Sequence, residues 1–190
     1  MDNNNLNSEE RENSSRSNST THESRLSISQ LKRLFEDELK DILWAEKALT
    51  KAMPKMIDNS QNPELRDAIS SHLTDTENQV IRIEQVFEEL GRPAVAQKCD
   101  AMDGLIKEAD VIIKESEEGS MRDAGIISAA QKVEHYEIAT YGTLRQMAET
   151  LELDRAVELL QATLEEEKAA DRKLTEIAVN IVNKQNILSN

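Results

Sequence analysis

The sequence predicts an all-α protein, and its composition carries this prediction. Of the 190 residues, 38% are hydrophobic and only 3% are aromatic, so that a core has to be built mainly from aliphatic side chains. Charged residues make up 32%, whereas glycine and proline occur only five and three times. Few turn formers and no long β-branched runs favour helices over strands. The length fits one domain with an added tail.

The charge and the single cysteine exclude several classes of function. A formal net charge of −14 argues against nucleic acid or an anionic membrane as a partner. No stretch approaches the roughly 18 apolar residues of a membrane span, and the first residues lack the apolar segment of a secretory signal. Cys99 is the only cysteine, which excludes an internal disulfide and a thiolate zinc site. We expect a reduced, cytoplasmic compartment.

The two ends of the chain are polar. Residues 1–25 are rich in Asn, Ser, Glu and Arg, and such a segment buries too little apolar surface to offset the entropy lost on ordering. We therefore expect a disordered tail over 1–25, a helical domain over 26–183 and a frayed end over 184–190.

Apolar residues at helical spacing predict two helical hairpins. The first helix is expected to open at Ser27, at the start of a capping-box pattern, and Pro54 is expected to kink its last turns. Asn62-Pro63-Glu64 predicts the start of the second helix, and Gly91-Arg92-Pro93 its end. The third helix begins near Ser120, with Asp123 three residues on, and a tight link at Leu153-Asp154 leads into the fourth.

The connection between the hairpins is long and carries a helical pattern of its own. Apolar residues recur at helical spacing within 94–119, at Met102, Leu105, Ile106, Ala109 and Ile113. A plain up-down-up-down bundle would need only a short link at this point. Two hairpins joined by a long crossover are the connectivity of ferritin-like bundles.

Acidic residues and one histidine interrupt the apolar stripes at positions that should face inward. They are Glu46 in the first helix, His72 and Asp75 in the second, Glu134 and Glu137 in the third, and Glu167 and Asp171 in the fourth. Counted from the turn of each hairpin, they lie at similar distances, and one residue of mismatch is only about 1.5 Å. All four helices are therefore expected to bring side chains to nearby levels of the bundle.

These side chains favour a metal centre. Buried carboxylates repel one another and are costly to desolvate, and bound cations remove both costs. Six carboxylates and one imidazole suit two divalent ions, for which we expect iron, with manganese or zinc as alternatives. The competing interpretation is a boundary acid that reaches solvent or pairs with lysine, and it applies best to Glu46 beside Lys47 and Glu167 beside Lys168. Glu166 is an alternative ligand to Glu167.

Other polar residues near these positions have less specific interpretations. His135 lies off the inward line and is expected on the surface or behind the ligands. Tyr141 is interpreted as a core residue with a hydrogen-bonded hydroxyl, with a redox-active neighbour as the alternative. Gln79 either donates to a ligand or is a polar boundary residue, and Cys99 is expected to be a small buried apolar residue.

Several segments carry a family resemblance. They are Trp44-Ala45-Glu46-Lys47, His72-Leu73 with Asp75-Thr76, Lys98-Cys99-Asp100-Ala101-Met102, the run from Ala130 to Ala139, and the run from Thr163 to Ala169. From about Leu31 to Asn183 the chain resembles the YciE/YciF family of bacterial ferritin-like proteins. The resemblance implies a rubrerythrin-like four-helix bundle with a di-iron site. It also implies a homodimer and a link to stress responses.

The resemblance assigns metal ligation to the same seven positions: Glu46, His72, Asp75, Glu134, Glu137, Glu167 and Asp171. Two departures concern the ligands. The usual Glu-x-x-His signature is missing, because the second helix offers His72-x-x-Asp75 and the fourth has no histidine. Position 75 is also Asp where relatives commonly carry Glu. We expect a di-iron protein that reacts with dioxygen or peroxide; the alternative is a non-catalytic stress or structural bundle held by its metal.

Overall fold

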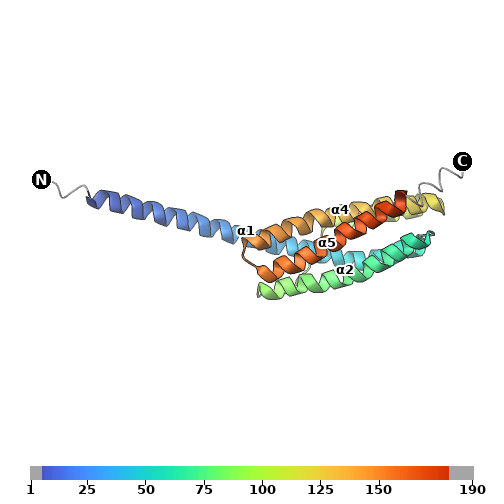
Figure 1. Ribbon diagram of the computed structural model, residues 1–190, viewed down its shortest axis with the longest axis horizontal. Coiled ribbons are helices and arrows are strands. Elements are labelled where there is room, and N and C mark those ends of the chain that lie inside the picture. Colours follow the sequence, from blue (N-terminus) through green and yellow to red (C-terminus); the bar gives the residue numbers. More distant parts are fainter. Residues whose placement is uncertain (1–5, 180–190) are drawn as a thin grey trace.

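The structure, a computed structural model, describes the backbone of residues 6–179 and the side chains of residues 26–179. This part of the chain is entirely helical and contains no strand. The helices are α1 (Leu6–Asn59), α2 (Pro63–Glu89), α3 (Asp100–Glu115), α4 (Ser120–Thr150) and α5 (Asp154–Ile177). The second half of α1 lies beside α2 and α4, and α5 packs against α2 and α4 on the other side, so that the four helices form one elongated bundle (Figure 1).

The start of α1 differs from the prediction. The helix begins at Leu6 instead of Ser27, so that residues 6–25, predicted as a disordered tail, continue α1 and project from the bundle (Figure 1). The capping-box pattern at Ser27 marks a possible start of a helix. Residues 6–25 contain no glycine or proline, however, that would stop a helix from running through Ser27. The hydroxyl of Ser29 donates to the carbonyl of Leu26, 2.8 Å away, within this continuous helix. Residues 1–5 and the predicted frayed end, 184–190, lie outside the described residues.

The turn between α1 and α2 is stabilised in part by residues that the sequence predicted at the start of the second helix. The Asn62 side chain accepts from the Leu65 amide at 3.1 Å, and Pro63 is the first helical residue, as predicted. Asp123 of α4 reaches the same turn, where its two carboxylate oxygens accept from the amides of Gln61 and Asn62 at 2.8 and 2.9 Å. A buried carboxylate thus fastens the first hairpin to the second.

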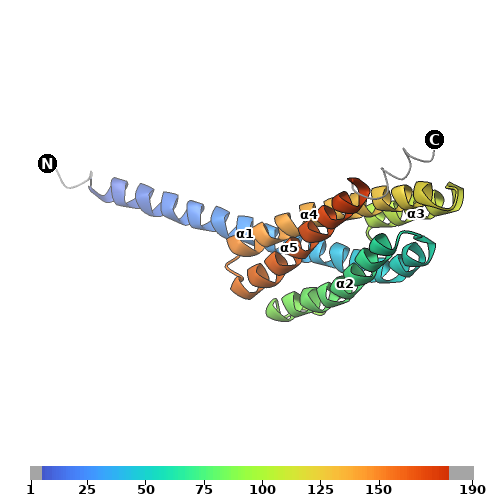
Figure 2. The same cartoon turned by 45° about the vertical axis from the view of Figure 1, so that its right-hand side comes forward.

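The crossover between the hairpins contains α3, as predicted. This helix packs against α4 and α1 on the outside of the bundle (Figure 2). Cys99 is buried, as expected, but it also caps the helix: its Sγ accepts from the Met102 amide at 3.3 Å and lies 3.1 Å from the hydroxyl oxygen of Tyr136. At the end of α2, Gly91 adopts a φ of 63°, a conformation that glycine reaches without strain. None of the helices within residues 6–179 is long and apolar enough to cross a membrane.

The interior of the bundle contains two apolar clusters. The first core cluster lies toward the α4–α5 turn and includes Phe35, Leu39, Phe87, Tyr141, Leu144 and Leu160. The second core cluster lies toward the α1–α2 turn and includes Met53, Met56, Leu65, Ile69, Ile127 and Leu174. On α2, α4 and α5, buried polar residues occupy the stretch of helix between the two clusters.

Candidate metal centre

Five polar side chains from all four long helices meet inside the bundle. Glu46 comes from α1, His72 from α2, Glu134 and Glu137 from α4, and Glu167 from α5, and none is more than 7% exposed. We call these five residues the acidic centre. One ligand atom from each of the last four lies within 4.8 Å of the others. Inward-facing positions on the apolar stripes therefore do converge, as the periodicity predicted.

Glu46 borders this group and is oriented by a tyrosine. The hydroxyl of Tyr141, which is fully buried, donates to Glu46 Oε1. Glu137 lies near enough to Glu46 for the charge of Glu46 to raise its pKa. The interpretation of Tyr141 as a core residue with a satisfied hydroxyl agrees with this arrangement.

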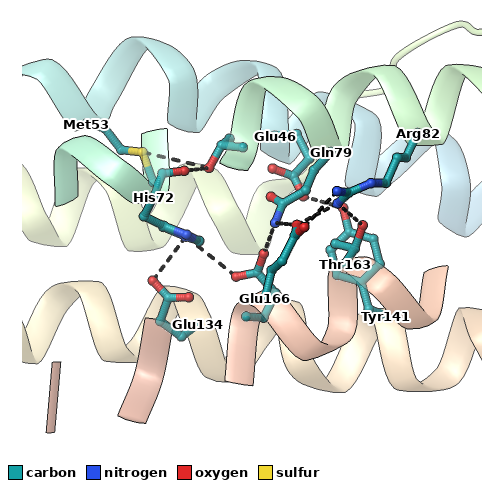
Figure 3. Close-up of polar contacts among 11 residues, drawn as sticks. Glu46, Met53, His72, Gln79, Arg82, Glu134, Tyr141, Thr163 and Glu166 are labelled. Carbon is teal, nitrogen blue, oxygen red and sulfur yellow. Dashed lines mark hydrogen bonds and ion pairs between the residues drawn. The ribbon is translucent and has the colours of Figure 1, made fainter. Parts of the chain in front are cut away.

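Many polar atoms of the acidic centre have no partner. Glu46 Oε2, both ring nitrogens of His72, Glu134 Oε2, both carboxylate oxygens of Glu137 and Glu167 Oε2 are buried without a hydrogen bond. The Nε2 atom of His72 faces Glu134 Oε1 at 3.3 Å (Figure 3). It also lies 3.5 Å from Glu167 Oε2. Buried polar atoms are nearly always paired, and each unpaired one costs about 1–3 kcal/mol. Seven such atoms at one point form a set that bound cations could satisfy.

Burial and mutual repulsion disfavour the charged forms of the four glutamates. Desolvation is the main cause that raises the pKa of Glu46, Glu134 and Glu137 well above the usual 4.5, followed by the charge of a neighbouring glutamate. Desolvation also raises the pKa of Glu167, although His72 and Gln79 lower it in part. A bound cation would favour the carboxylate forms that this environment otherwise penalises.

Two residues on α2 contact the adjacent glutamates Glu166 and Glu167 of α5. Arg82 makes two hydrogen bonds to Glu166, at 2.5 and 2.6 Å, and holds it at the edge of the bundle (Figure 3). Gln79 is fully buried, and its amide donates to Glu167 Oε1 and Glu166 Oε2. Glu167, and not Glu166, therefore belongs to the acidic centre. The sequence analysis missed Arg82, although its position three residues after Gln79 places it on the same face of α2.

Asp75 and Asp171 lie apart from the acidic centre. Asp171 is half-buried; it accepts from Gln131 Nε2 at 3.1 Å and lies 3.5 Å from His135 Nε2. Asp75 is half-buried beside a cavity between the helices. Both are one turn from a residue of the centre, and an Asp side chain is one methylene shorter than Glu, so their carboxylates do not reach it. Ligation by either residue stays a prediction, whereas His135, 70% exposed at its side chain, lies on the surface as expected.

The donor set fits divalent metal ions. Four carboxylates and one imidazole are ligands that iron, manganese and zinc share. The unpaired atoms come from α1, α2, α4 and α5, and His72, Glu134, Glu137 and Glu167 each offer a ligand atom within 4.8 Å of the others, so that cations could satisfy them. Two apolar core clusters flank the acidic centre.

Two antiparallel hairpins, a long crossover and acidic residues meeting in the middle define a ferritin-like helical bundle protein. Within this class, the chain belongs to the family described as domain of unknown function (DUF892), whose model matches residues 30–186. Five sequence segments predicted a resemblance to the YciE/YciF family. This prediction is confirmed, because the E. coli protein YciF is similar to the chain in both sequence and structure.

Known proteins resemble the chain over most of its length. Protein YciF from Escherichia coli K12 is 46% identical over 161 residues, which cover 84% of this chain and 97% of YciF. The crystal structure of the E. coli stress protein YciF matches with a TM-score of 0.78 and 48% identity, over 81% of this chain and 98% of that one. YcfI from Rhodopseudomonas palustris matches with a TM-score of 0.74 and 45% identity, over 76% and 92%. A protein from Xanthomonas campestris, 21% identical with a TM-score of 0.65 over 81% and 94%, shares the fold.

Proposed function

We propose that the acidic centre binds two divalent metal ions, iron in the first place, and that the loaded protein reacts with dioxygen or peroxide. The observation that carries the proposal is the set of seven buried ligand atoms without a hydrogen bond on Glu46, His72, Glu134, Glu137 and Glu167. Among the described side chains of residues 26–179, His72 is the only basic group of the acidic centre, and the nearby Arg82 is engaged with Glu166.

Charge supports two ions over one. The four glutamates of the acidic centre carry four negative charges when ionised, which two divalent ions balance. A single divalent ion would leave two charges uncompensated in a buried site, at a cost of several kcal/mol. His72 adds a neutral donor, since a ring nitrogen without a proton can bind a metal.

The surrounding residues would orient the ligands. Bound iron would supply electron exchange with oxygen species. Tyr141 holds its hydroxyl proton at Glu46 Oε1, and Gln79 fixes Glu167 by an amide hydrogen bond. Such partners set the direction of a ligand and are often as important as the ligand itself.

The biological setting is inferred from relatives. The E. coli protein YciF is described as a stress protein, and we propose that this chain acts in a stress response too. The expected homodimer stays a prediction, which sedimentation of the purified chain tests directly.

A pair of glutamates on α5 offers a matched test. Glu167 is fully buried in the acidic centre, while Glu165, two residues earlier, is exposed and paired with Lys168. Protein purified without a metal-affinity tag and loaded anaerobically with Fe(II) should contain about two ions per chain by elemental analysis and consume peroxide. The Glu167→Gln variant should lose most of the metal and the peroxide consumption, and Glu165→Gln should retain both. Equal metal content in the two variants would reject the assignment.

A structural role for the metal is the second candidate. The ligand groups come from α1, α2, α4 and α5, so that bound ions would cross-link the two hairpins. The relative YcfI is described provisionally as a structural protein. This candidate predicts that a chelator lowers the melting temperature while peroxide consumption stays at background in the metal-loaded protein.

A further inference from the structure

A cavity of about 510 Å³ lies next to the acidic centre, on the side of the second core cluster. This volume is within the range of about 300–1,000 Å³ that is typical of small-molecule sites. Residues of all five helices line it. The exposed part of the lining belongs mainly to α2 and α5, at Asp67, Ser71 and Lys173, so that the cavity opens to solvent between these two helices.

The wall of the cavity is apolar and made of small residues. Met53, Ile69 and Leu174 of the second core cluster contribute buried side chains. Alanines from every helix fill the rest of the wall: Ala52, Ala68, Ala109, Ala130, Ala169 and Ala170. Each alanine leaves space that a leucine would fill. Water finds few hydrogen-bond partners beside such an apolar surface.

The inner end of the cavity meets the acidic centre. His72 and Glu134 belong to its lining, and they are 7% and 2% exposed. Both nitrogens of His72 and one oxygen of Glu134 lack a hydrogen-bond partner. A molecule inside the cavity would therefore contact the side chains that we propose as metal ligands.

The mouth of the cavity carries mostly negative charge. Glu64, Asp67 and Asp75 line it on α2. Lys173 is the one lysine or arginine among the residues that line the cavity. An anion would thus meet unfavourable charge on entry, whereas an uncharged molecule would not.

We propose that the cavity binds an uncharged, largely hydrocarbon molecule, which lies against His72 and Glu134. That this molecule is a substrate of the metal centre rests on the proposed function; that the cavity binds it does not. The ligand class follows from the apolar wall, the volume and the acidic mouth. The uncharged character separates the proposal from a site for fatty-acid anions.

Binding can be measured with an apolar dye and a matched pair of competitors. Nile red is uncharged and fluoresces strongly in apolar sites, and we expect the full-length chain to bind it at one saturable site. Dodecanol should displace the dye, and dodecanoate, which has the same chain length and a negative charge, should do so at least about ten-fold less effectively. Absence of saturable binding, or equal displacement by both competitors, would overturn the proposal.

Cavity-filling variants locate the dye. Ala68→Leu with Ala170→Leu should weaken binding by at least about ten-fold, because the added side chains occupy the space of the ligand. Ala162→Leu is the control, since Ala162 is an exposed residue of α5 that does not line the cavity. Ser71→Trp provides a second variant at the exposed mouth, where interior packing is unchanged, and it should slow or block entry. Unchanged dye binding in a folded double variant and in Ser71→Trp would reject the site.

The metal proposal and the cavity proposal fail separately. Glu137 belongs to the acidic centre but does not line the cavity. The Glu137→Gln variant should lose metal and keep the dye, while Ala68→Leu with Ala170→Leu should keep metal and lose the dye. Loss of dye binding in Glu137→Gln would show that the apolar site is not independent of the centre and would contradict the proposal.

Discussion

The two halves of the bundle interior are built from the same helices but differ in filling. The first core cluster contains the large side chains Phe35, Phe87 and Tyr141, all fully buried. The second core cluster relies on methionine, isoleucine and leucine, and a cavity of about 510 Å³ extends along it between alanines. The acidic centre lies between a closely packed half and a hollow one. Access to His72 and Glu134 is thus provided from the side of the second core cluster.

The largest expected effect comes from truncating one residue in each half. Phe87→Ala should lower the free energy of unfolding by about 3–5 kcal/mol, since it opens a new void in the packed half. Leu174 borders an existing cavity. We expect Leu174→Ala to lower the free energy of unfolding by about 2 kcal/mol, near the lower end of the range for such truncations. Urea denaturation of metal-free protein measures both. Equal costs would show that the two halves do not differ in packing.

The pH dependence of the metal-free protein tests the region between the halves. Burial and the charge of Glu46 raise the pKa of Glu137 well above 4.5, so that the folded state holds a proton that the unfolded state releases. The stability associated with this group is full below pH 4.5 and is lost as pH rises through the raised pKa, at about 1.4 kcal/mol per pKa unit.

The variant Glu137→Gln removes this titration. In the presence of a chelator it should be more stable than the parent chain at pH 8 and little changed at pH 4, as measured by thermal melting. Addition of Fe(II) without oxygen should reverse the order at neutral pH, because only the parent chain gains from metal binding. Glu165→Gln, an exposed change, should follow the parent chain throughout. A parent chain whose metal-free stability rises from pH 5 to pH 8 would contradict the electrostatic account.

The stability of the half that contains the second core cluster should depend on the hydrogen bonds between Asp123 and the α1–α2 turn. Asp123→Asn replaces a carboxylate that accepts from the amides of Gln61 and Asn62, and leaves one oxygen in place of two. We expect a loss of about 2 kcal/mol in urea denaturation, since hydrogen bonds to charged groups are worth about 1.5–3 kcal/mol. Asp67→Asn, at an exposed position, should stay within about 0.5 kcal/mol. A similar small change at both positions would remove Asp123 as a fastening point.

The smallest effect should come from the surface pair over the hollow half. Lys55 Nζ of α1 lies 2.6 Å from Asp110 Oδ1 of α3, and both side chains are 51% exposed. Exposed pairs contribute about 0–1 kcal/mol, so that a double-mutant cycle of Lys55→Ala and Asp110→Ala should give a coupling below about 1 kcal/mol that salt weakens. A larger coupling would mean that the ion pair, and not the apolar contacts, holds α3 over the cavity.

Much of the helical framework followed from local pattern. Apolar stripes predicted the two hairpins and the crossover helix, and Asn62-Pro63 predicted the start of α2, because capping and period are properties of neighbouring residues. The start of α1 was predicted wrongly at Ser27: a capping pattern does not by itself stop a helix that already runs through it. The interpretation of an acidic centre also came from the stripes, since an inward position is fixed by helical period.

The tertiary structure determined which of the inward-facing residues meet, which the helical period does not specify. Arg82 holds Glu166 at the edge of the bundle, whereas Glu167 belongs to the acidic centre, and Asp75 and Asp171 lie outside it. The cavity could not be predicted either, because its volume depends on how side chains from five helices fill the same space. The sequence by itself determined which residues face inward, through the geometry of single helices. Only the packed bundle decided which of them meet and where space remains, because contacts between helices depend on side-chain length and the partners opposite.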